Sequence, residues 1–167
     1  MDTVKHLQSQ LRDKFDYNYM TGDFIRTKKT SPRSKLGVVG SKGAGGYLRV
    51  SFLGDLQYVQ RLIWVWLYGE WPDEIDHINH DKADNRRSNI RNVNRLENCR
   101  NLSLSKNNTS GVVGVGFFYG AYKATIKVKG KTIYLGFFKD KSTAIKIRRK
   151  AEIEYGFHPN HGSRTDE

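Results

Sequence analysis

Hydrophobic positions near the start of the chain follow first a helical and then an extended spacing. Val4, Leu7 and Leu11 recur at helical intervals and predict a short amphipathic helix within residues 1–13. Aromatic side chains then alternate with other residues over positions 17–25, around a Thr-Gly-Asp turn that is typical of a hairpin. The pattern therefore predicts a helix followed by two short paired strands.

A second extended segment follows a basic stretch. Residues 28–35 are rich in Lys and Arg, contain a Ser-Pro pair and are expected to form an exposed loop. Residues 47–53 alternate with period two and predict a strand, which a Gly-Asp turn connects to another extended segment at 57–59. Residues 1–46 are accordingly assigned to a β-rich, basic N-terminal region.

The run from Leu62 to Tyr68 is apolar throughout, so periodicity alone allows either a buried strand or a short core helix. Gly69 and the Trp-Pro pair after it are stop signals that favour a helix ending at Gly69. Trp64 and Trp66 are interpreted as core residues. A membrane-spanning helix needs roughly 18 or more apolar residues. Since the run is far shorter and the N-terminus lacks an apolar signal core, we expect a cytoplasmic protein with no membrane partner.

The pattern changes twice in the second half of the chain. Residues 93–101 have helical character, with Leu96 and Cys99 on one side, and the small polar residues 103–110 are typical of a linker. Beyond the linker the pattern predicts three strands and one helix, over residues 112–118, 121–129, 132–138 and 141–155. Residues 158–167 are polar and are expected to form a solvated tail. The chain as a whole is predicted to be α+β.

Charge indicates a polyanionic partner. The chain carries 29 Lys and Arg against 17 Asp and Glu, a net charge of +12. Residues 1–69 contribute +6 and residues 106–156 contribute +8, whereas residues 70–101 sum to −1. Clustered Lys and Arg neutralise phosphates and release counterions, which favours nucleic acid; the alternative is charge that serves solubility alone. The lone Cys99 allows neither an internal disulfide nor a cysteine-rich zinc site and indicates a reducing compartment.

The near-neutral segment holds the candidate chemistry. Asp76 and His77 are adjacent, and Asn98 follows 22 residues after Asp76. A carboxylate and a carboxamide can together hold one hard divalent cation, Mg²⁺ or Mn²⁺, while a neutral imidazole takes a proton from an attacking water. This combination suits hydrolysis of a phosphodiester. Two alternatives stay open: a surface ion pair between Asp76 and His77, and a zinc site that uses the spacing of His77 and His80.

The motifs around Asp76 resemble a known family. In order, they are Asp76-His77, Asp84-Asn85-Arg86, Ser88-Asn89-Ile90-Arg91 and Glu97-Asn98-Cys99-Arg100-Asn101. Their order and spacing are similar to those of HNH endonucleases of the ββα-metal fold, in particular the phage and intron homing enzymes. The resemblance implies that His77 is the general base, that Asp76 and Asn98 hold the metal, and that Asn89 braces the loop and the base. Relatives often carry His where this chain has Gln60, which leaves the role of position 60 open.

The C-terminal segment resembles a second family, the AP2 DNA-binding domains. The motifs are Ser110-Gly111-Val112-Val113-Gly114-Val115, Tyr122-Lys123-Ala124-Thr125-Ile126 and Ile133-Tyr134-Leu135-Gly136-Phe137-Phe138, followed by Ala144 and Ala151. In that family a three-stranded sheet lies in the major groove. Lys123 stands where relatives have Arg, and because Lys cannot form the bidentate contact to guanine, weaker sequence reading is expected. HNH and AP2 modules in one chain are an arrangement known from homing endonucleases.

The resulting hypothesis is a metal-dependent endonuclease that acts on double-stranded DNA. It assigns residues 47–102 to the nuclease module, 103–110 to a linker, 111–157 to the AP2-like domain and 158–167 to the tail. The residues predicted to contact DNA are Arg86, Arg87, Arg91, Lys123, Lys127, Lys129 and Lys131. These arginines, together with Arg95, could instead pair with Asp81, Asp84 or Glu97. Tyr119, Tyr122 and Tyr134 could touch DNA, although packing of the small core is favoured.

The sequence leaves several points open. It indicates no small-molecule cofactor, and dimerisation is not readable from it, so the oligomeric state stays open with a monomer favoured. It gives neither the recognition sequence nor the number of strands cut. One alternative is a DNA-binding or regulatory protein with an inactive nuclease module, and another is an RNA-binding protein that uses the same basic surfaces.

Overall fold

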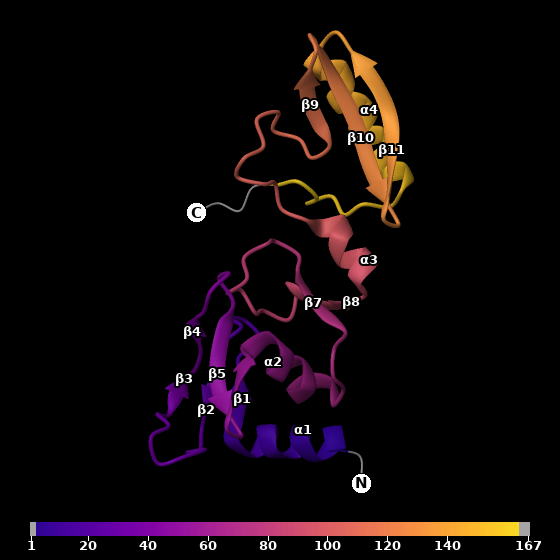
Figure 1. The fold of residues 1–167 in the computed structure, drawn as a ribbon. Helices are drawn as coiled ribbons and strands as arrows, with labels where there is room; N and C mark the ends of the chain where they lie inside the picture. The colour runs from indigo at the N-terminus through magenta and orange to yellow at the C-terminus, as the bar shows by residue number, and fades with distance from the viewer. Residues whose placement is uncertain (1–2, 164–167) are drawn as a thin grey trace. The chain divides into compact units, whose positions relative to one another are not determined.

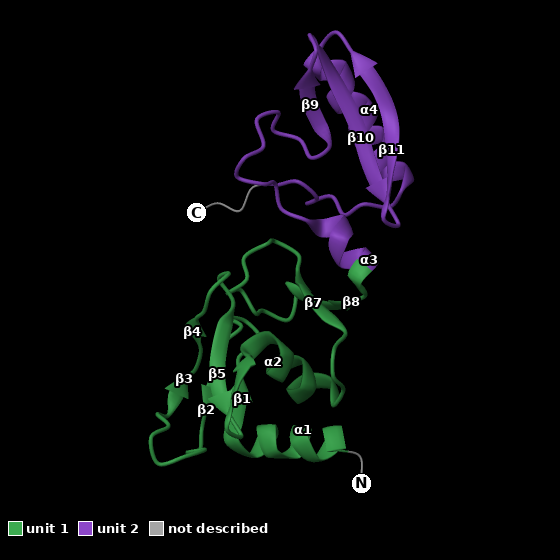
Figure 2. Ribbon diagram, in the orientation of Figure 1, with its two compact units in different colours: residues 1–95 green, residues 96–167 purple. Residues whose placement is uncertain are grey.

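The chain forms two compact units. The computed structural model describes residues 3–163, and structural statements concern this part of the chain. The units are residues 1–95 and 96–167, each with its own hydrophobic core (Figure 2). The division thus falls after Arg95, whereas the sequence places the end of the nuclease module at residue 102.

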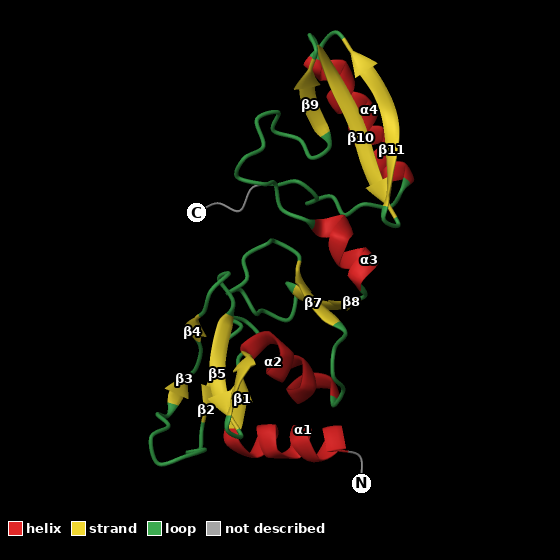
Figure 3. Ribbon diagram, viewed as in Figure 1, coloured by secondary structure: helices red, strands yellow, loops and turns green. Residues whose placement is uncertain are grey.

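The first unit combines two helices with small antiparallel sheets (Figures 1 and 3). Its elements are α1 (Thr3–Lys14), β1 (Phe15–Tyr17), β2 (Phe24–Arg26), β3 (Gly37–Val38), β4 (Ser41–Lys42), β5 (Leu48–Phe52), β6 (Asp55–Tyr58), α2 (Val59–Tyr68), β7 (Glu74–His77) and β8 (Ile90–Val93). β1, β2 and β3 form one sheet, β4, β5 and β6 form a second, and β7 pairs with β8. The predicted hairpin and the strand predicted over residues 47–53 are confirmed, as is the N-terminal helix within the described residues.

Aromatic side chains fill the core of the first unit. Phe15 of β1 stacks on Phe24 of β2 at 4.6 Å between ring centroids and meets Phe52 of β5 edge-on at 5.4 Å. Leu11 of α1 and Ile63 of α2, each with 0% of its surface exposed, pack into the same cluster. The two helices and the first two sheets therefore share one core. This core holds the end of α2, from which the chain continues into β7.

The apolar run is a helix, as its stop signals indicate. Gly69 ends α2 in the left-handed region at φ 68°, and its N–H donates to the carbonyl of Val65 at 2.8 Å. Trp64 is buried with 8% exposed, and Trp66 is partly buried against the same core, so both are core residues as predicted. No helix in residues 3–163 has the length and apolar character needed to cross a membrane.

The predicted helix over residues 93–101 begins too early. Val93 is the last residue of β8, and α3 spans only Arg95–Asn98, followed by a 3₁₀ turn over Cys99–Asn101. Ile90 and Val93 are buried in the first unit, with 1% and 6% exposed, because β8 pairs with β7 across a long loop. That pairing is non-local, so a local periodicity window does not show it.

The second unit has the predicted order of three strands and one helix. β9 (Val115–Phe118), β10 (Ala121–Val128) and β11 (Lys131–Phe138) form an antiparallel sheet in the order β11-β10-β9, and α4 (Lys141–Glu154) packs against it. Asp140 caps α4 by accepting a hydrogen bond from the N–H of Thr143 at 2.7 Å. A small cluster including Val115, Ala124 and Ala144 forms the core under the helix.

Two expectations for this unit are wrong. Tyr119 and Tyr134 do not pack a core, since 103% and 56% of their surfaces are exposed. The solvated tail is also wrong for residues 158–163: Gly162 donates to the carbonyl of Leu102 at 2.8 Å, and His161 is 2% exposed. Residues 158–163 thus pack against the segment around Leu102, at the start of the second unit. This long-range contact cannot be predicted from their polar composition. Residues 164–167 lie outside the described part.

Candidate active site

β7 and β8 bring the candidate catalytic pair to the start of a loop. The strands are antiparallel, with Asp76 opposite Arg91 and His77 opposite Ile90. Asp76 and His77 are both buried, with 5% and 4% of their surfaces exposed. Successive side chains of a strand point to opposite faces, so the two groups begin from different sides of the same short strand.

Asp76 is held by its cross-strand neighbour. Arg91 donates to Oδ2 of Asp76 from Nε at 2.9 Å and from Nη2 at 2.7 Å. The Asp76 side chain is 6% exposed and that of Arg91 is 34% exposed, so the pair is partly shielded from water. One of the carboxylate oxygens is therefore engaged with a cation that the protein itself supplies.

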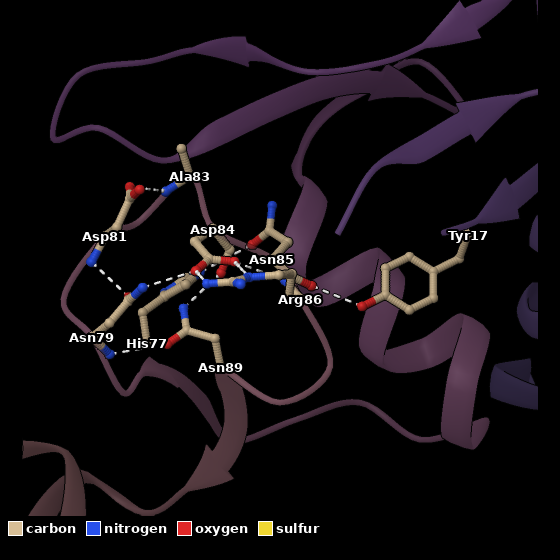
Figure 4. Close-up of polar contacts among 9 residues, drawn as sticks. All are labelled: Tyr17, His77, Asn79, Asp81, Ala83, Asp84, Asn85, Arg86 and Asn89. Carbon is tan, nitrogen blue, oxygen red and sulfur yellow. Dashed lines mark hydrogen bonds and ion pairs between the residues drawn. The ribbon is translucent and has the colours of Figure 1, made fainter. Parts of the chain in front are cut away.

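His77 is oriented by a carboxamide from the loop. Its Nε2 lies 3.0 Å from Oδ1 of Asn85, within hydrogen-bond distance (Figure 4). Asn85 is 1% exposed, and its backbone carbonyl accepts a 2.8 Å hydrogen bond from the hydroxyl of Tyr17 on β1. Burial lowers the pKa of the His77 imidazole, an effect that the bond to Asn85 and the charge of Asp76 partly oppose. His77 is therefore a neutral base at neutral pH.

Asn89 closes the loop that carries Asn85. Its Oδ1 accepts from the N–H of Asn79 at 2.9 Å and its Nδ2 donates to the carbonyl of Asp84 at 2.8 Å, so one side chain joins both ends of the loop (Figure 4). The backbone adds a bond from the N–H of Ile78 to the carbonyl of Asn89 at 2.9 Å. Asn89 thus links distant parts of the loop, while the bond to the ring of His77 comes from Asn85. The role of Asn89 in catalysis stays a prediction.

Asp84 and Arg86 form a compact ion pair within this loop. Both oxygens of Asp84 accept from the Arg86 guanidinium, at 2.8 and 2.6 Å, and Oδ2 also accepts from Nδ2 of Asn79 at 2.8 Å. The hydrogen bond from Arg86 lowers the pKa of Asp84, and Asp84 in turn raises the pKa of Arg86. Arg86 thus pairs with Asp84, one of the acids considered for it, whereas Arg91 pairs with Asp76, which was not among them.

Arg87 is held differently. Its guanidinium lies over the rings of Trp64 and Tyr68, at 5.9 and 5.2 Å from their centroids. The three arginines predicted to contact DNA are thus all fixed by the protein, and their roles toward DNA stay predictions.

The N-terminal hairpin approaches the loop very closely. Gly22, in the turn between β1 and β2, has φ 80°, and a Cβ placed on it would lie 2.5 Å from the backbone nitrogen of Arg86 and 2.7 Å from the carbonyl carbon of Asn85. No side chain fits this approach without moving the loop backbone. Together with the hydroxyl of Tyr17, the hairpin therefore fixes the segment that orients His77.

The predicted metal ligands belong to different units. Asp76 lies in the first unit, and Asn98 ends α3 at the start of the second, so their joint role stays a prediction. Their oxygen donors are of the type that Mg²⁺ and Mn²⁺ prefer. Among the described residues no group of three or more His, Cys, Asp or Glu side chains could hold a metal.

Three of the predicted DNA-contacting lysines of the second unit, Lys127, Lys129 and Lys131, are exposed, and Lys123 is half-buried. Lys123 and Lys127 alternate on β10 with the buried Ala124 and Ile126, so they occupy the face of the sheet away from the core. Lys129 and Lys131 are exposed and lie at the tight turn into β11.

Sequence reasoning missed two residues of the site, and it gave Asn85 no role. Nothing local links Tyr17 or Gly22 to the loop, because both come from a hairpin about 60 residues earlier in the chain. Gln60, whose role was left open, is buried on α2 with 4% exposed, and its Oε1 has no hydrogen-bond partner among the described residues.

Comparison with known proteins gives one finding for this site. No curated protein and no solved structure gives a significant match to the chain. The segment that contains α2, the Asp76-His77 pair, the loop and α3 does match a family model. Residues 57–100 of this chain match the model of the HNH endonucleases, a family of nucleases.

Proposed function

We propose that the protein is a divalent-metal-dependent endonuclease that hydrolyses phosphodiester bonds of duplex DNA, of the homing type. The observation that carries the proposal is the hydrogen bond of 3.0 Å between the buried His77 and Asn85, inside the segment that matches HNH endonucleases. A histidine with an oriented ring, a lowered pKa and a braced loop is what a general base requires.

The chain's own residues divide the work. In this proposal the Nδ1 atom of His77 takes a proton from the attacking water. Oδ1 of Asn85 accepts a hydrogen bond from the Nε2–H group both before and after that transfer. Asp76 and Asn98 would hold the cation. When bound, a divalent cation stabilises charge that develops on the phosphate and the departing oxygen. Asn89 holds the loop together through its two side-chain hydrogen bonds, which keeps Asn85 within hydrogen-bond distance of the His77 ring.

The sheet of the second unit is proposed to hold the DNA, as the likeness to AP2 domains implies. Its face away from α4 combines Lys123 and Lys127 with exposed rings: Phe118, Tyr134 and Phe137 have 50%, 56% and 49% of their surfaces exposed. Lysines neutralise phosphates, and aromatic rings contact sugars and bases. The sheet would then supply affinity and register, and the first unit the chemistry.

One observation favours a second candidate, a DNA-binding protein without nuclease activity. Oδ2 of Asp76 is already bound by Arg91, and a cation would have to share this carboxylate with the guanidinium or displace it. In this candidate the Asp76–Arg91 pair is purely structural, and the basic surfaces alone carry the function.

Plasmid cleavage separates the two. Supercoiled DNA is incubated with the full chain in Mg²⁺ or Mn²⁺, with and without EDTA, using the wild type, His77→Ala and a matched control, His6→Ala, whose histidine lies exposed on α1. We expect metal-dependent nicking by the wild type and the control, and a loss of about 10²-fold or more in His77→Ala. Tight duplex binding without any nicking would establish the second candidate, and equal nicking by His77→Ala would remove His77 as the base.

A further inference from the structure

A groove in the first unit lies among strands that the nuclease chemistry does not use. It has a volume of about 730 Å³ and is formed by β2, the β2–β3 loop, β3, β4, β5 and the β5–β6 turn. In Figure 1 the strands β2, β3, β4 and β5 are labelled on the left side of the first unit. Four of the residues that line the groove are cationic, namely Arg26, Arg33, Lys35 and Arg49, and none of its described lining residues is acidic.

Arg26 is the unusual member of this set. Only 7% of its surface is exposed, and burial lowers the pKa of its guanidinium. It donates to the carbonyls of Lys35 and Ser51, each at 3.2 Å, and lies over the Phe15 ring at 5.3 Å. Its neighbours are thus neutral carbonyls and a ring, and within the described chain no carboxylate balances its charge. Buried charges are normally paired, so a nine-tenths buried cation without a counter-charge indicates a partner that comes from outside.

Arg49 extends the positive wall. Its Nη2 donates to the hydroxyl of Tyr58 at 3.0 Å and its guanidinium lies 4.9 Å from the centroid of that ring. Its Nε, like that of Arg26, is buried without a hydrogen-bond partner among the described residues. Stacking on Tyr58 fixes the side chain, which reduces the conformational entropy that would be lost on binding a ligand.

The remaining lining fits a sugar-phosphate chain better than a small anion. Ser31, Ser41 and Ser51 offer hydroxyl donors along the groove, while Val38 and Leu53 present apolar surface, with 65% and 59% of each residue exposed. A free phosphate ion is too small to contact all four cations and makes no favourable contact with apolar residues. A nucleic acid backbone presents anionic phosphates and apolar sugar edges in alternation.

We propose that this groove binds the sugar-phosphate backbone of the DNA. It would be a second attachment site in addition to the sheet of the second unit, and it lies on the unit that carries the loop between β7 and β8. The inference rests on the proposed function for its choice of DNA. Because it sits on the first unit itself, such a contact would hold the duplex on that unit independently of the sheet of the second unit.

The test compares two double variants of the full chain that lose equal charge. The groove variant is Arg33→Gln with Lys35→Gln, two exposed residues of the lining. The control is Lys29→Gln with Lys42→Gln, two exposed lysines on the same loop and on β4 that do not line the groove. Binding of a fluorescent duplex is followed by anisotropy in EDTA over a range of salt concentrations.

We expect the groove variant to raise Kd about tenfold and to lower the slope of log K against log salt by roughly 2, since each neutralised phosphate contributes about 0.9. The control should change Kd less than threefold and leave the slope almost unchanged. Arg49→Gln, measured alone, should give an intermediate loss of affinity. Equal effects of the groove and control variants would overturn the proposal.

Two further arms separate the alternatives. If inorganic phosphate at constant ionic strength raises the Tm of the wild type but not of the groove variant, while both bind DNA equally, the groove takes a free anion and the proposal fails. Plasmid nicking by the same variants tests the activity separately. If none of the proteins nicks the plasmid but the groove variant still binds DNA more weakly than the control, only the nuclease function is contradicted. If the proteins nick the plasmid and the groove variant binds DNA as tightly as the wild type, only the groove proposal is contradicted.

Discussion

Arg91 places two donors, Nε and Nη2, on one oxygen of Asp76, at 2.9 and 2.7 Å, directly across the β7–β8 ladder. The pair ties the residue proposed to hold the metal to the strand that follows the loop. Its side chains are 6% and 34% exposed, so the interaction is stronger than that of a surface ion pair but weaker than that of a fully buried one.

Removing Arg91 should destabilise the first unit. Arg91→Gln leaves a buried carboxylate without its cation, and we expect a loss of roughly 2 kcal/mol, less than the roughly 3–5 kcal/mol for a fully buried pair. Trp64, Trp66 and Trp71, the three tryptophans of the chain, lie in the first unit, so urea unfolding followed by tryptophan fluorescence reports on this unit. In a double-mutant cycle with Asp76→Asn the losses should not add. Ca²⁺ should stabilise Arg91→Gln more than the wild type if Asp76 binds a cation.

The proton acceptor should set the acid side of the pH–rate profile. Burial lowers the pKa of His77, so the acid limb of the nicking rate should lie below the ordinary histidine value of about 6.5. Asn85→Asp puts a carboxylate beside Nε2 and should raise that pKa, which moves the acid limb to higher pH. An acid limb that does not move would show that another group titrates.

The same shift predicts how stability depends on pH. The folded form of His77 resists protonation, whereas the unfolded chain accepts the proton near pH 6.5. Its contribution is present above that pH and is lost as pH falls from about 6.5 toward the lower folded pKa. The free energy of unfolding of the first unit should therefore fall less steeply in His77→Ala over this range. A pH dependence identical to the wild type would contradict the shift.

Tyr17 should matter to catalysis although it lies on β1. Tyr17→Phe removes the bond of 2.8 Å to the Asn85 carbonyl, and we expect a loss of about 1 kcal/mol in stability and a several-fold lower kcat, with KM little changed. Burial raises the pKa of Tyr17 to about 12, whereas the unfolded phenol ionises near 10. The wild type should therefore lose this contribution as pH rises from about 10 to 12, and Tyr17→Phe should not. Nicking kinetics and urea unfolding measure both effects.

Gly22 tests the contact between the hairpin and the loop. Gly22→Ala adds strain at φ 80° and places a Cβ against the backbone at Asn85 and Arg86, and we expect it to cost about 2 kcal/mol or more and to slow nicking. Gly37→Ala is the control, since Gly37 also has positive φ, at 101°, but nothing lies within 4 Å of the added carbon. If both variants lose the same stability, the cost is strain alone and the close approach has no role.

Local spacing was enough for most elements of the fold. The stop signal at Gly69 and the alternation over residues 47–53 depend on neighbours within a few positions, and the structure confirms both. The strand-strand-strand-helix order of the second unit was predictable for the same reason. β8 and the packed residues 158–163 were not, because their partners lie far away along the chain.

The sequence by itself determined the chemical groups of the candidate site: a carboxylate next to an imidazole, in a segment rich in Asn, between two basic regions. Only the tertiary structure decided which groups meet. In the folded chain His77 contacts Asn85, and Asp76 pairs with Arg91. The loop backbone contacts Tyr17 and lies close to Gly22. The physical reason is that side-chain identity is a local property of the chain, whereas burial, hydrogen-bond partners and pKa depend on segments that only the packed core brings together.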